Sequence, residues 1–226
     1  MGQAGNRNYT SEKELPSVVS VFPLEGALLL PGGQMPLNIF EPRYLQMIDD
    51  AIAAERIVGM IQPSLMSTAG GEGERELCAV GCLGRITALT ETGDGRYLVT
   101  LHGIARFRIE EEIDTREPYR RCRIKSFIAD LDLEREAAEV DREALLGAFR
   151  MYLEANQLEA DWASVIKASN ETLVNALCMM SPYGAAEKQA LLEAPDLKTR
   201  AETLVAITEI SLARESNEDG PGPTLQ

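Results

Sequence analysis

Histidines and positive charges are scarce in this sequence, and each scarcity excludes a class of function. The 226 residues include a single histidine, His102. Most zinc sites and Ser-His-Asp triads therefore lose a ligand or a partner. Lys and Arg total 22 against 36 Asp and Glu, which gives a formal charge of −14. A field of that sign repels phosphate backbones, so unspecific binding to nucleic acids is disfavoured.

Paired cysteines and long hydrophobic runs are also missing. The four cysteines, Cys78, Cys82, Cys122 and Cys178, form no C-x-x-C pair. A chain in which 45% of the residues are hydrophobic can bury a core without disulfides, so we expect free thiols. Residues 1–16 lack the apolar stretch of a secretory signal, and no run approaches the roughly 20 apolar residues that span a bilayer. We therefore expect a reduced, cytoplasmic protein.

The residue pattern divides the chain into four segments. Residues 1–14 are polar and are expected to form a flexible arm. Residues 15–129 consist of short β-branched runs separated by Gly and Pro, which is typical of a β-rich domain. Residues 130–214 are rich in Ala, Glu and Leu at helical spacing and predict a helical bundle. Residues 215–226 are rich in helix breakers and predict a disordered tail.

Several local signals predict particular elements. Pro42 fits the first turn of a helix, and Phe40, Tyr44 and Leu45 are expected to anchor that helix to the sheet. Asp94-Gly95 predicts a tight hairpin turn. Alternation over residues 104–109 predicts a strand with Ala105, Phe107 and Ile109 on one face and Arg106 and Arg108 on the other. Asp196 is expected to cap a helix that begins at Leu197.

The search for catalytic or metal-binding motifs finds only weak candidates. Ser164-Val165-Ile166-Lys167 matches Ser-x-x-Lys, but its companion elements are missing, and an exposed lysine on a helix is the favoured interpretation. The glycines at 70, 71 and 73 are followed by no Lys-Ser or Lys-Thr and predict a surface loop over residues 63–76. The acidic run 110–114 is interpreted as a solvated strand end, and His102 as structural or exposed. No catalytic residue, metal or cofactor is expected.

One stretch is locally basic and supports an alternative function. Residues 116–125 carry several arginines and a tyrosine, which could hold single-stranded nucleic acid on a strand. The candidate residues for this alternative are Arg106, Arg108, Arg120, Arg121 and Arg123. Because the rest of the chain is acidic, ion pairing of these arginines with carboxylates is the favoured interpretation.

Three blocks of the sequence resemble a known family. The run Leu30-Pro31-Gly32-Gly33-Gln34-Met35-Pro36-Leu37-Asn38-Ile39-Phe40-Glu41-Pro42-Arg43-Tyr44 looks like the N-terminal, substrate-binding domain of the Lon protease family, in particular its free-standing versions. Residues 95–99 and 103–109 are similar to a second block of that domain. Residues 187–193, with Asp196 and Arg200, are similar to its helical part. The resemblance covers about residues 17–212.

The resemblance implies an α+β fold, in which a PUA-like, β-rich pseudo-barrel domain with one inserted helix is followed by a C-terminal helical bundle. In full-length Lon proteases this region captures unfolded or tagged protein, while separate ATPase and Ser-Lys peptidase domains unfold and cut it. The present sequence has no phosphate-binding Gly-Lys-Ser/Thr element, and no peptidase domain begins before Gln226. ATP hydrolysis and proteolysis are therefore not expected of these residues.

The sequence and the resemblance together predict a non-catalytic module that recognises proteins or peptides. Flexible methionines near predicted loops are the candidate binding residues, namely Met35, Met60 and Met66. A sheet edge beside the 63–76 loop is a second candidate, which would bind an extended peptide by strand addition. The expected partners are unfolded or client polypeptides, and a protease or ligase acting in trans, with no membrane. The alternative is an RNA-binding PUA-like module that uses the basic 116–125 strand.

Overall fold

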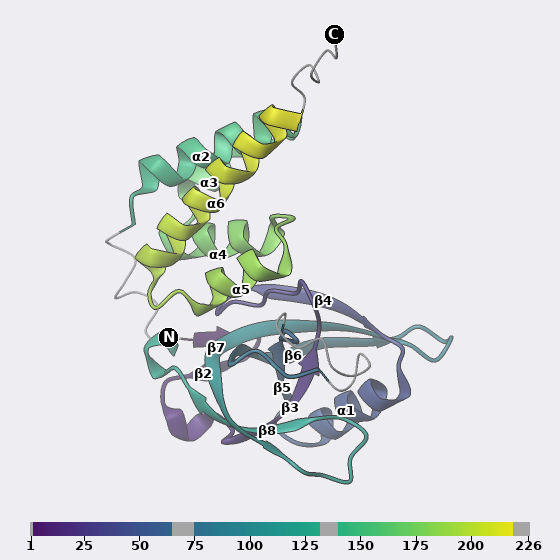
Figure 1. The fold of residues 1–226 in the computed structure, drawn as a ribbon. Coiled ribbons are helices and arrows are strands. Elements are labelled where there is room, and N and C mark those ends of the chain that lie inside the picture. The colour runs from purple at the N-terminus through teal and green to yellow at the C-terminus, as the bar shows by residue number, and fades with distance from the viewer. Residues whose placement is uncertain (1, 65–74, 132–139, 219–226) are drawn as a thin grey trace. The chain divides into compact units, whose positions relative to one another are not determined.

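The computed structural model describes residues 2–64, 75–131 and 140–218 (Figure 1). In chain order the elements are β1 (Gly2–Ala4), β2 (Arg7–Tyr9), η1 (Glu12–Glu14), β3 (Val18–Pro23), β4 (Gln34–Ile39), α1 (Pro42–Ala53), β5 (Ile57–Ile61), β6 (Val80–Glu91), β7 (Tyr97–Ile113), β8 (Arg121–Ser126), η2 (Ile128–Leu131), α2 (Arg142–Ala155), α3 (Trp162–Lys167), α4 (Asn170–Met180), α5 (Ala185–Glu193) and α6 (Leu197–Glu218). The chain divides into two compact units, which we call the sheet unit (residues 1–135 and 175–193) and the helical unit (residues 136–174 and 194–226).

The sheet unit is built on a single six-stranded sheet in the order β4-β7-β6-β5-β3-β8. β7 is 17 residues long, and its C-terminal half also pairs with β8, so the sheet curls into a closed ring. β4 lies outside that ring, paired with the N-terminal half of β7. β3 and β5 are parallel, and α1 lies between β4 and β5 in the chain. The predicted α+β class, with one helix inserted among the strands, is confirmed.

The local signals in the sequence explain where several elements begin. α1 begins at Pro42, whose missing N–H is one that the first helical turn leaves unbonded anyway. The β6–β7 turn places Gly93 and Gly95 at φ of 79° and 85°, a region that glycine enters without steric cost. Asp196 Oδ1 accepts a hydrogen bond of 2.7 Å from the backbone N–H of Thr199 and thereby caps α6. The predicted hairpin and helix cap are confirmed.

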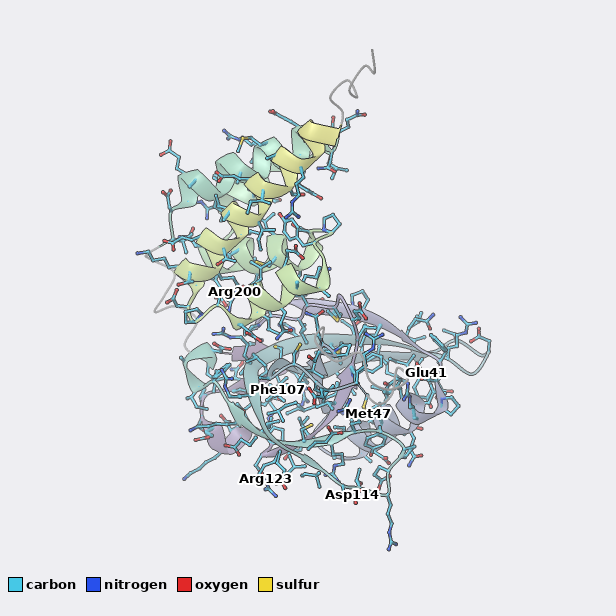
Figure 2. The ribbon with its side chains drawn as sticks, in the orientation of Figure 1. Glu41, Met47, Phe107, Asp114, Arg123 and Arg200 are labelled. Atoms are coloured by element: carbon cyan, nitrogen blue, oxygen red, sulfur yellow. The ribbon has the colours of Figure 1, made fainter. Side chains whose placement is uncertain are left out.

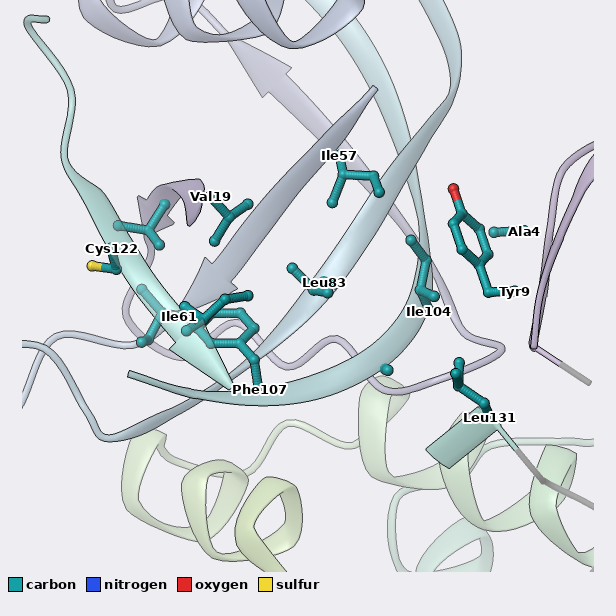
Figure 3. Close-up of a cluster of buried hydrophobic side chains, with 13 residues drawn as sticks. Ala4, Tyr9, Val19, Ile57, Ile61, Leu83, Ile104, Phe107, Cys122 and Leu131 are labelled. Atoms are coloured by element: carbon teal, nitrogen blue, oxygen red, sulfur yellow. The ribbon is translucent and has the colours of Figure 1, made fainter. Parts of the chain in front are cut away.

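The core of the sheet unit lies inside the ring (Figure 3). Phe107 has no exposed surface, and two glycines make room for its ring. A Cβ at Gly81 would lie 2.5 Å from Phe107 Cζ, and a Cβ at Gly59 would lie 3.0 Å from the same atom. The glycines in β5 and β6 are thus required by close packing rather than by backbone conformation.

The predicted alternation along residues 104–109 is only partly correct. The pairing of β6 with β7 shifts register between Leu83 and Gly84, which leaves Ile104 as an extra residue in β7. As a result, Ile104 and Ala105 are consecutive and both belong to the core. Arg106 is also buried, at 5% exposure, because the opposite face of β7 is covered here as well. A strand with both faces covered does not alternate between buried and exposed residues.

The sequence predicts a flexible arm over residues 1–14. For the described residues 2–14 this prediction is wrong, because they form a hairpin and a short helix. β1 and β2 pair as an antiparallel hairpin, with Gly2 opposite Tyr9. Ala4 and Tyr9 have no exposed surface and belong to the core cluster, and Arg85 Nη1 donates to Tyr9 Oη at 3.2 Å. Two well-placed side chains and a turn at Gly5, whose φ is 62°, are enough to order a segment that is otherwise polar.

The helical unit contains fewer of the helices than the predicted 130–214 bundle. α2 packs against α6, and Leu145, Ala148 and Leu204 are buried in this unit. Residues 175–193, which include α5, instead belong to the sheet unit. Within that unit, Gln62 Nε2 donates to the carbonyl oxygen of Ala185 at 3.0 Å, and Lys188 Nζ donates to the carbonyl oxygen of Gly26 at 2.9 Å. These long-range hydrogen bonds have no signature in local sequence.

Residues 215–218, the first part of the tail predicted to be disordered, instead form the end of α6, which continues to Glu218. Residues 219–226 and most of the 63–76 loop lie outside the described residues. The described ends of that loop are held together, since Pro63 and Leu77 form a β-bridge.

Candidate peptide-binding surface

β4 is the edge strand of the sheet, and its exposure alternates strictly along the chain (Figure 1). Gln34, Pro36 and Asn38 are exposed, whereas Met35 and Leu37 are half-buried and Ile39 is buried. Phe40, which follows the strand, continues the exposed series at 62% exposure. One face of β4 therefore packs inward, and the other is open to solvent.

The open face of β4 continues onto the neighbouring strands. Leu98 of β7 is 49% exposed and lies opposite Asn38, which makes it a diagonal neighbour of Pro36 and of the position of Phe40. Thr90 of β6 lies opposite Leu98. We call this surface the outer sheet face; its members are Pro36, Asn38, Phe40, Ala88, Thr90, Leu98 and Thr100. Because it exposes the large apolar side chains of Phe40 and Leu98, the outer sheet face is a candidate site of interaction.

The free edge of β4 is only partly suited to strand addition. The N–H of Gly103 donates to the carbonyl oxygen of Gly33 at 2.8 Å, so the odd-numbered residues of β4 direct their backbone groups toward β7. The even-numbered residues then face away from the sheet, and Pro36 among them has no N–H to donate. An extended peptide along β4 would lack one backbone hydrogen bond at the centre of the strand. For such a peptide, side-chain contacts with the outer sheet face would be the larger source of affinity.

Of the three methionines predicted to bind peptide, only Met35 lies at the described surface. Met35 is half-buried on β4, on the face opposite the outer sheet face. Met60 is 3% exposed within β5 and packs in the interior, so a peptide could not reach it in this arrangement. Met66 lies outside the described residues.

The predicted sheet edge beside the 63–76 loop is wrong. That loop joins β5 to β6, and each of these strands has a neighbour on both sides. The edge is β4 instead. Sequence patterns reveal that strands exist, but the order of strands in a sheet depends on pairings between distant segments.

Two arginines of the basic stretch, Arg120 and Arg123, form ion pairs with carboxylates, as the favoured interpretation predicted. Arg120 Nε donates to Glu112 Oε1 at 2.6 Å and forms a two-pronged contact with that carboxylate. Arg123, on the outer surface of β8, lies 3.4 Å from Glu111 (Figure 2). Glu111 and Arg123 are cross-strand partners, which explains the pairing. Glu111 and Glu112 of the acidic run on β7 therefore pair with Arg123 of β8 and with Arg120, which directly precedes β8.

Two other arginines of the nucleic-acid alternative are also engaged. Arg106 Nε and Nη2 donate to the two carboxylate oxygens of Asp130 at 2.8 Å each, and its Nη1 donates to the carbonyl oxygen of Leu192 at 3.1 Å. This guanidinium is buried and cannot contact a phosphate. Arg108 lies over the ring of Phe127, at 6.0 Å from its centroid. The remaining candidate, Arg121, lines a cleft on another part of the sheet unit.

The contacts of the weak catalytic candidates Ser164 and His102 indicate structural roles. Ser164 Oγ donates to Asp161 Oδ2 at 2.5 Å, and Asp161 also accepts from backbone N–H groups at the start of α3. The hydrogen bond from Ser164 lowers the pKa of Asp161, so the hydroxyl stabilises a carboxylate that caps the helix. Ser164 and Lys167 are both exposed. His102 lies opposite Gln34, and burial lowers its pKa below the usual range.

The described residues contain neither a cluster of metal ligands nor a helix suited to cross a membrane. Among the side chains that the structure places, no group of three or more His, Cys, Asp or Glu is arranged to hold a metal ion. Within the described ranges, no helix combines the length and the apolar character that a bilayer crossing requires. The four cysteines are free thiols, three of them buried.

Sequence reasoning missed the two side chains that dominate the outer sheet face. Phe40 was expected to anchor α1, but it is 62% exposed, and the anchor is Tyr44, whose ring meets that of Phe22 at 4.4 Å between centroids. Leu98 was placed in the hairpin without a role. The alternation of Pro36, Asn38 and Phe40 carried the signal, since these positions fall on the face opposite Leu37 and Ile39.

Comparison with known proteins gives a consistent result. The sequence profile of the ATP-dependent protease La (LON) substrate-binding domain matches residues 18–209. The chain is similar to Lon protease 2 of Sorangium cellulosum, with 32% identity over 203 residues, covering 84% of this chain and 24% of that protein. It is 29% identical over 196 residues to the Lon protease of Parabacteroides distasonis, covering 84% of this chain and 23% of that protein. The chain therefore spans about a quarter of the length of these relatives.

Two solved structures share the fold. The crystal structure of a Lon N-terminal domain protein from Xanthomonas campestris has a TM-score of 0.60 at 21% identity and covers 84% of this chain and 98% of that chain. The N-terminal domain of the Mycobacterium avium complex Lon protease has a TM-score of 0.58 at 17% identity, covering 85% and 98% respectively. Agreement at such low identity concerns the path of the backbone.

Proposed function

The chain belongs to the family of ATP-dependent protease La (LON) substrate-binding domains, and on that premise we propose that it is a non-catalytic module that binds polypeptide segments through the outer sheet face. The observation that carries the proposal is the exposure of Phe40 and Leu98 beside an edge strand. Aromatic and aliphatic side chains in an unfolded segment can bury apolar surface against them, and this burial drives association.

The proposed binding is weak and tolerant of sequence. The outer sheet face is open rather than a deep pocket, and Pro36 interrupts the backbone donors of the edge. Neither feature selects a particular side chain. The ligands that fit are segments with exposed apolar side chains, which folded proteins keep inside and unfolded proteins present.

The proposal also covers partners and location. We propose that the bound ligands are passed to a protease or ligase acting in trans. A reduced, cytoplasmic setting is supported by the four free thiols. Nucleic-acid binding is the less favoured alternative, because Arg106, Arg120 and Arg123 are paired with carboxylates. RNA binding would weaken steeply with added salt, whereas apolar capture would not.

The proposal is tested by removing the exposed apolar side chains. The double variant Phe40→Ser, Leu98→Ser should bind a labelled unfolded apolar peptide about five- to tenfold more weakly, since two well-placed apolar contacts contribute at least about 1 kcal/mol. Fluorescence anisotropy measures the affinity. Leu158→Ser is the matched control, because Leu158 is exposed to a similar extent, at 53%, but lies in the helical unit.

The two possible results separate clearly. Loss of binding in the double variant, with Leu158→Ser unchanged, supports the outer sheet face as the binding surface. Equal affinity for the wild type and the double variant, both with unaltered thermal unfolding, would place the binding surface elsewhere.

A further inference from the structure

A cleft of about 850 Å³ lies in the sheet unit and is lined by no residue of β4. We propose that this cleft binds a Lys or Arg side chain of a polypeptide ligand, an inference that rests on the proposed function. Three segments line it: the start of β3 with the residues before it, α1 from Gln46 onward with the start of β5, and the β7–β8 connection with the first residue of β8. A cleft of this volume is in the range of sites that hold small ligands or several side chains.

The walls of the cleft suit the aliphatic stem of a long cationic side chain. Apolar atoms come from Val18, Ala51, Ala54 and Ile57. Lys and Arg bury the methylene groups of their stems against such surfaces while their charged ends seek polar partners. An acidic side chain, or a short polar one, would gain nothing from the same walls.

The charged groups of the cleft are mostly carboxylates. Asp50, Glu55 and Glu117 line it, against a single cation, Arg121. The whole chain adds a formal charge of −14, which attracts cations toward this surface. Because no group of three or more such side chains converges on a metal site among the described residues, an extended organic cation fits the cleft better than a metal ion.

Two side-chain hydrogen bonds hold the carboxylates across the cleft. Tyr119 Oη donates to Asp50 Oδ2 at 2.7 Å, and Gln46 Nε2 donates to Glu117 Oε2 at 3.3 Å. Both connect α1 to the β7–β8 connection. A carboxylate offers about four acceptor positions, so Asp50 can accept from a further donor while Tyr119 remains bound.

Tyr119 is suited to this positioning role over a wide pH range. Its ring is 7% exposed, and burial, assisted by the neighbouring carboxylate of Asp50, raises the pKa of Tyr119 to about 12. The phenol therefore keeps its proton and remains a donor to Asp50 at neutral pH.

The strand beside the cleft supplies an independent reason to expect a peptide there. β3 pairs with β8 over Val18–Ser20, but its pairing with β5 begins only at Val21. The stretch Val18–Ser20 thus forms part of the cleft wall with a ladder on one side. Backbone groups on the other side of such a stretch can meet the main chain of a bound peptide.

The experiment compares twin peptides that differ in one side chain. Both carry the same apolar sequence, one with a central arginine and the other with glutamine. The wild type should bind the arginine peptide about three- to fivefold more tightly, the range expected for ion pairs at an exposed site. The double variant Glu55→Gln, Glu117→Gln should lose most of that preference. Glu110→Gln is the matched control, because Glu110 is exposed on β7 and does not line the cleft.

The outcomes distinguish this inference from the proposed function. If neither peptide binds, the proposed function fails. If both bind with equal affinity to the wild type and to the double variant, the outer sheet face acts alone and the cleft inference is overturned. Free agmatine, which is arginine without its carboxylate, should shift the NMR resonances of Gln46 and Tyr119 only at much higher concentration than the peptide. Equal potency of agmatine would show that the cleft takes a small cation and not a polypeptide.

Discussion

The two halves of β7 belong to one continuous strand but have opposite surroundings. In the half from Tyr97 to His102, one face packs inward and the other, with Leu98 at 49% exposure, is open. In the half from Gly103 to Ile109, five consecutive residues, 103–107, are buried. The difference arises from what covers the strand, since η2 and α5 contribute Asp130 and Leu192 to the second half only. The proposed binding surface lies where that cover ends.

The largest expected effect on stability comes from removing the side chain of Arg106, which lies in the second half of β7. Arg106→Ala should lower the free energy of unfolding by about 3–5 kcal/mol, because it leaves Asp130 as an uncompensated charge at 8% exposure. Urea unfolding followed by circular dichroism measures the change. Arg108→Ala is the control, since Arg108 is exposed on the same strand. If the two variants lose similar stability, the ion pair with Asp130 is not what holds this half.

The junction between the halves should tolerate no added methyl group. Gly103 is buried, and a Cβ there would clash with the carbonyl oxygen of Leu30, a backbone atom that cannot easily move. Gly103→Ala should therefore destabilise the protein by about 1–3 kcal/mol.

The same substitution at another glycine, Gly147, should have the opposite effect on stability. A Cβ at Gly147, inside α2, would meet nothing within 4 Å, so Gly147→Ala should stabilise the protein by about 0.5–1 kcal/mol. Thermal unfolding of both variants tests the pair. A neutral Gly103→Ala variant would mean that the two halves are less tightly joined to the segment around Leu30 than the structure shows.

The smallest effect concerns His102, at the end of the open half. Burial lowers its pKa in the folded protein, while a backbone hydrogen bond with Gly32 opposes the shift. As pH falls below about 6.5, the unfolded chain binds a proton before the folded one does, so stability decreases until the folded pKa is passed. His102→Gln should remove the contribution of His102 to this pH dependence of stability. Subtracting the stability-versus-pH profile of the variant from that of the wild type separates the contribution of His102 from those of the carboxylates. An NMR titration that gives His102 a pKa above 6.5 would contradict the sign.

Much of the fold could be predicted from local sequence because local rules produced it. Pro42, the Asp94-Gly95 turn and the Asp196 cap act within a few residues, and all three were found where the sequence indicated. The family could be recognised from the block around Pro36 for a similar reason, since a contiguous motif needs no tertiary information. The ion pairing of the basic strand also followed from composition, because carboxylates outnumber the cations.

The predictions from sequence that were wrong share a different cause. The β1–β2 hairpin, the membership of α5 in the sheet unit and the exposure of Phe40 each depend on contacts between segments far apart in the chain. Gln62 Nε2, for example, donates a hydrogen bond of 3.1 Å to Gln189 Oε1, although the two residues are 127 positions apart in the chain. No local period or composition encodes such a pairing.

The sequence by itself determined the kinds of element, the acidic character of the protein and the family to which it belongs. Tertiary structure decided which faces of those elements stay open, because exposure is a property of what lies above a residue and not of the residue itself. Leu98 and Phe107 are both apolar residues of one strand, yet one is at the surface and the other has no exposed area. Phe107 packs in the core inside the closed ring, whereas Leu98 lies on the outer face of the strand, in the half that η2 and α5 do not cover, and the outer sheet face is the result.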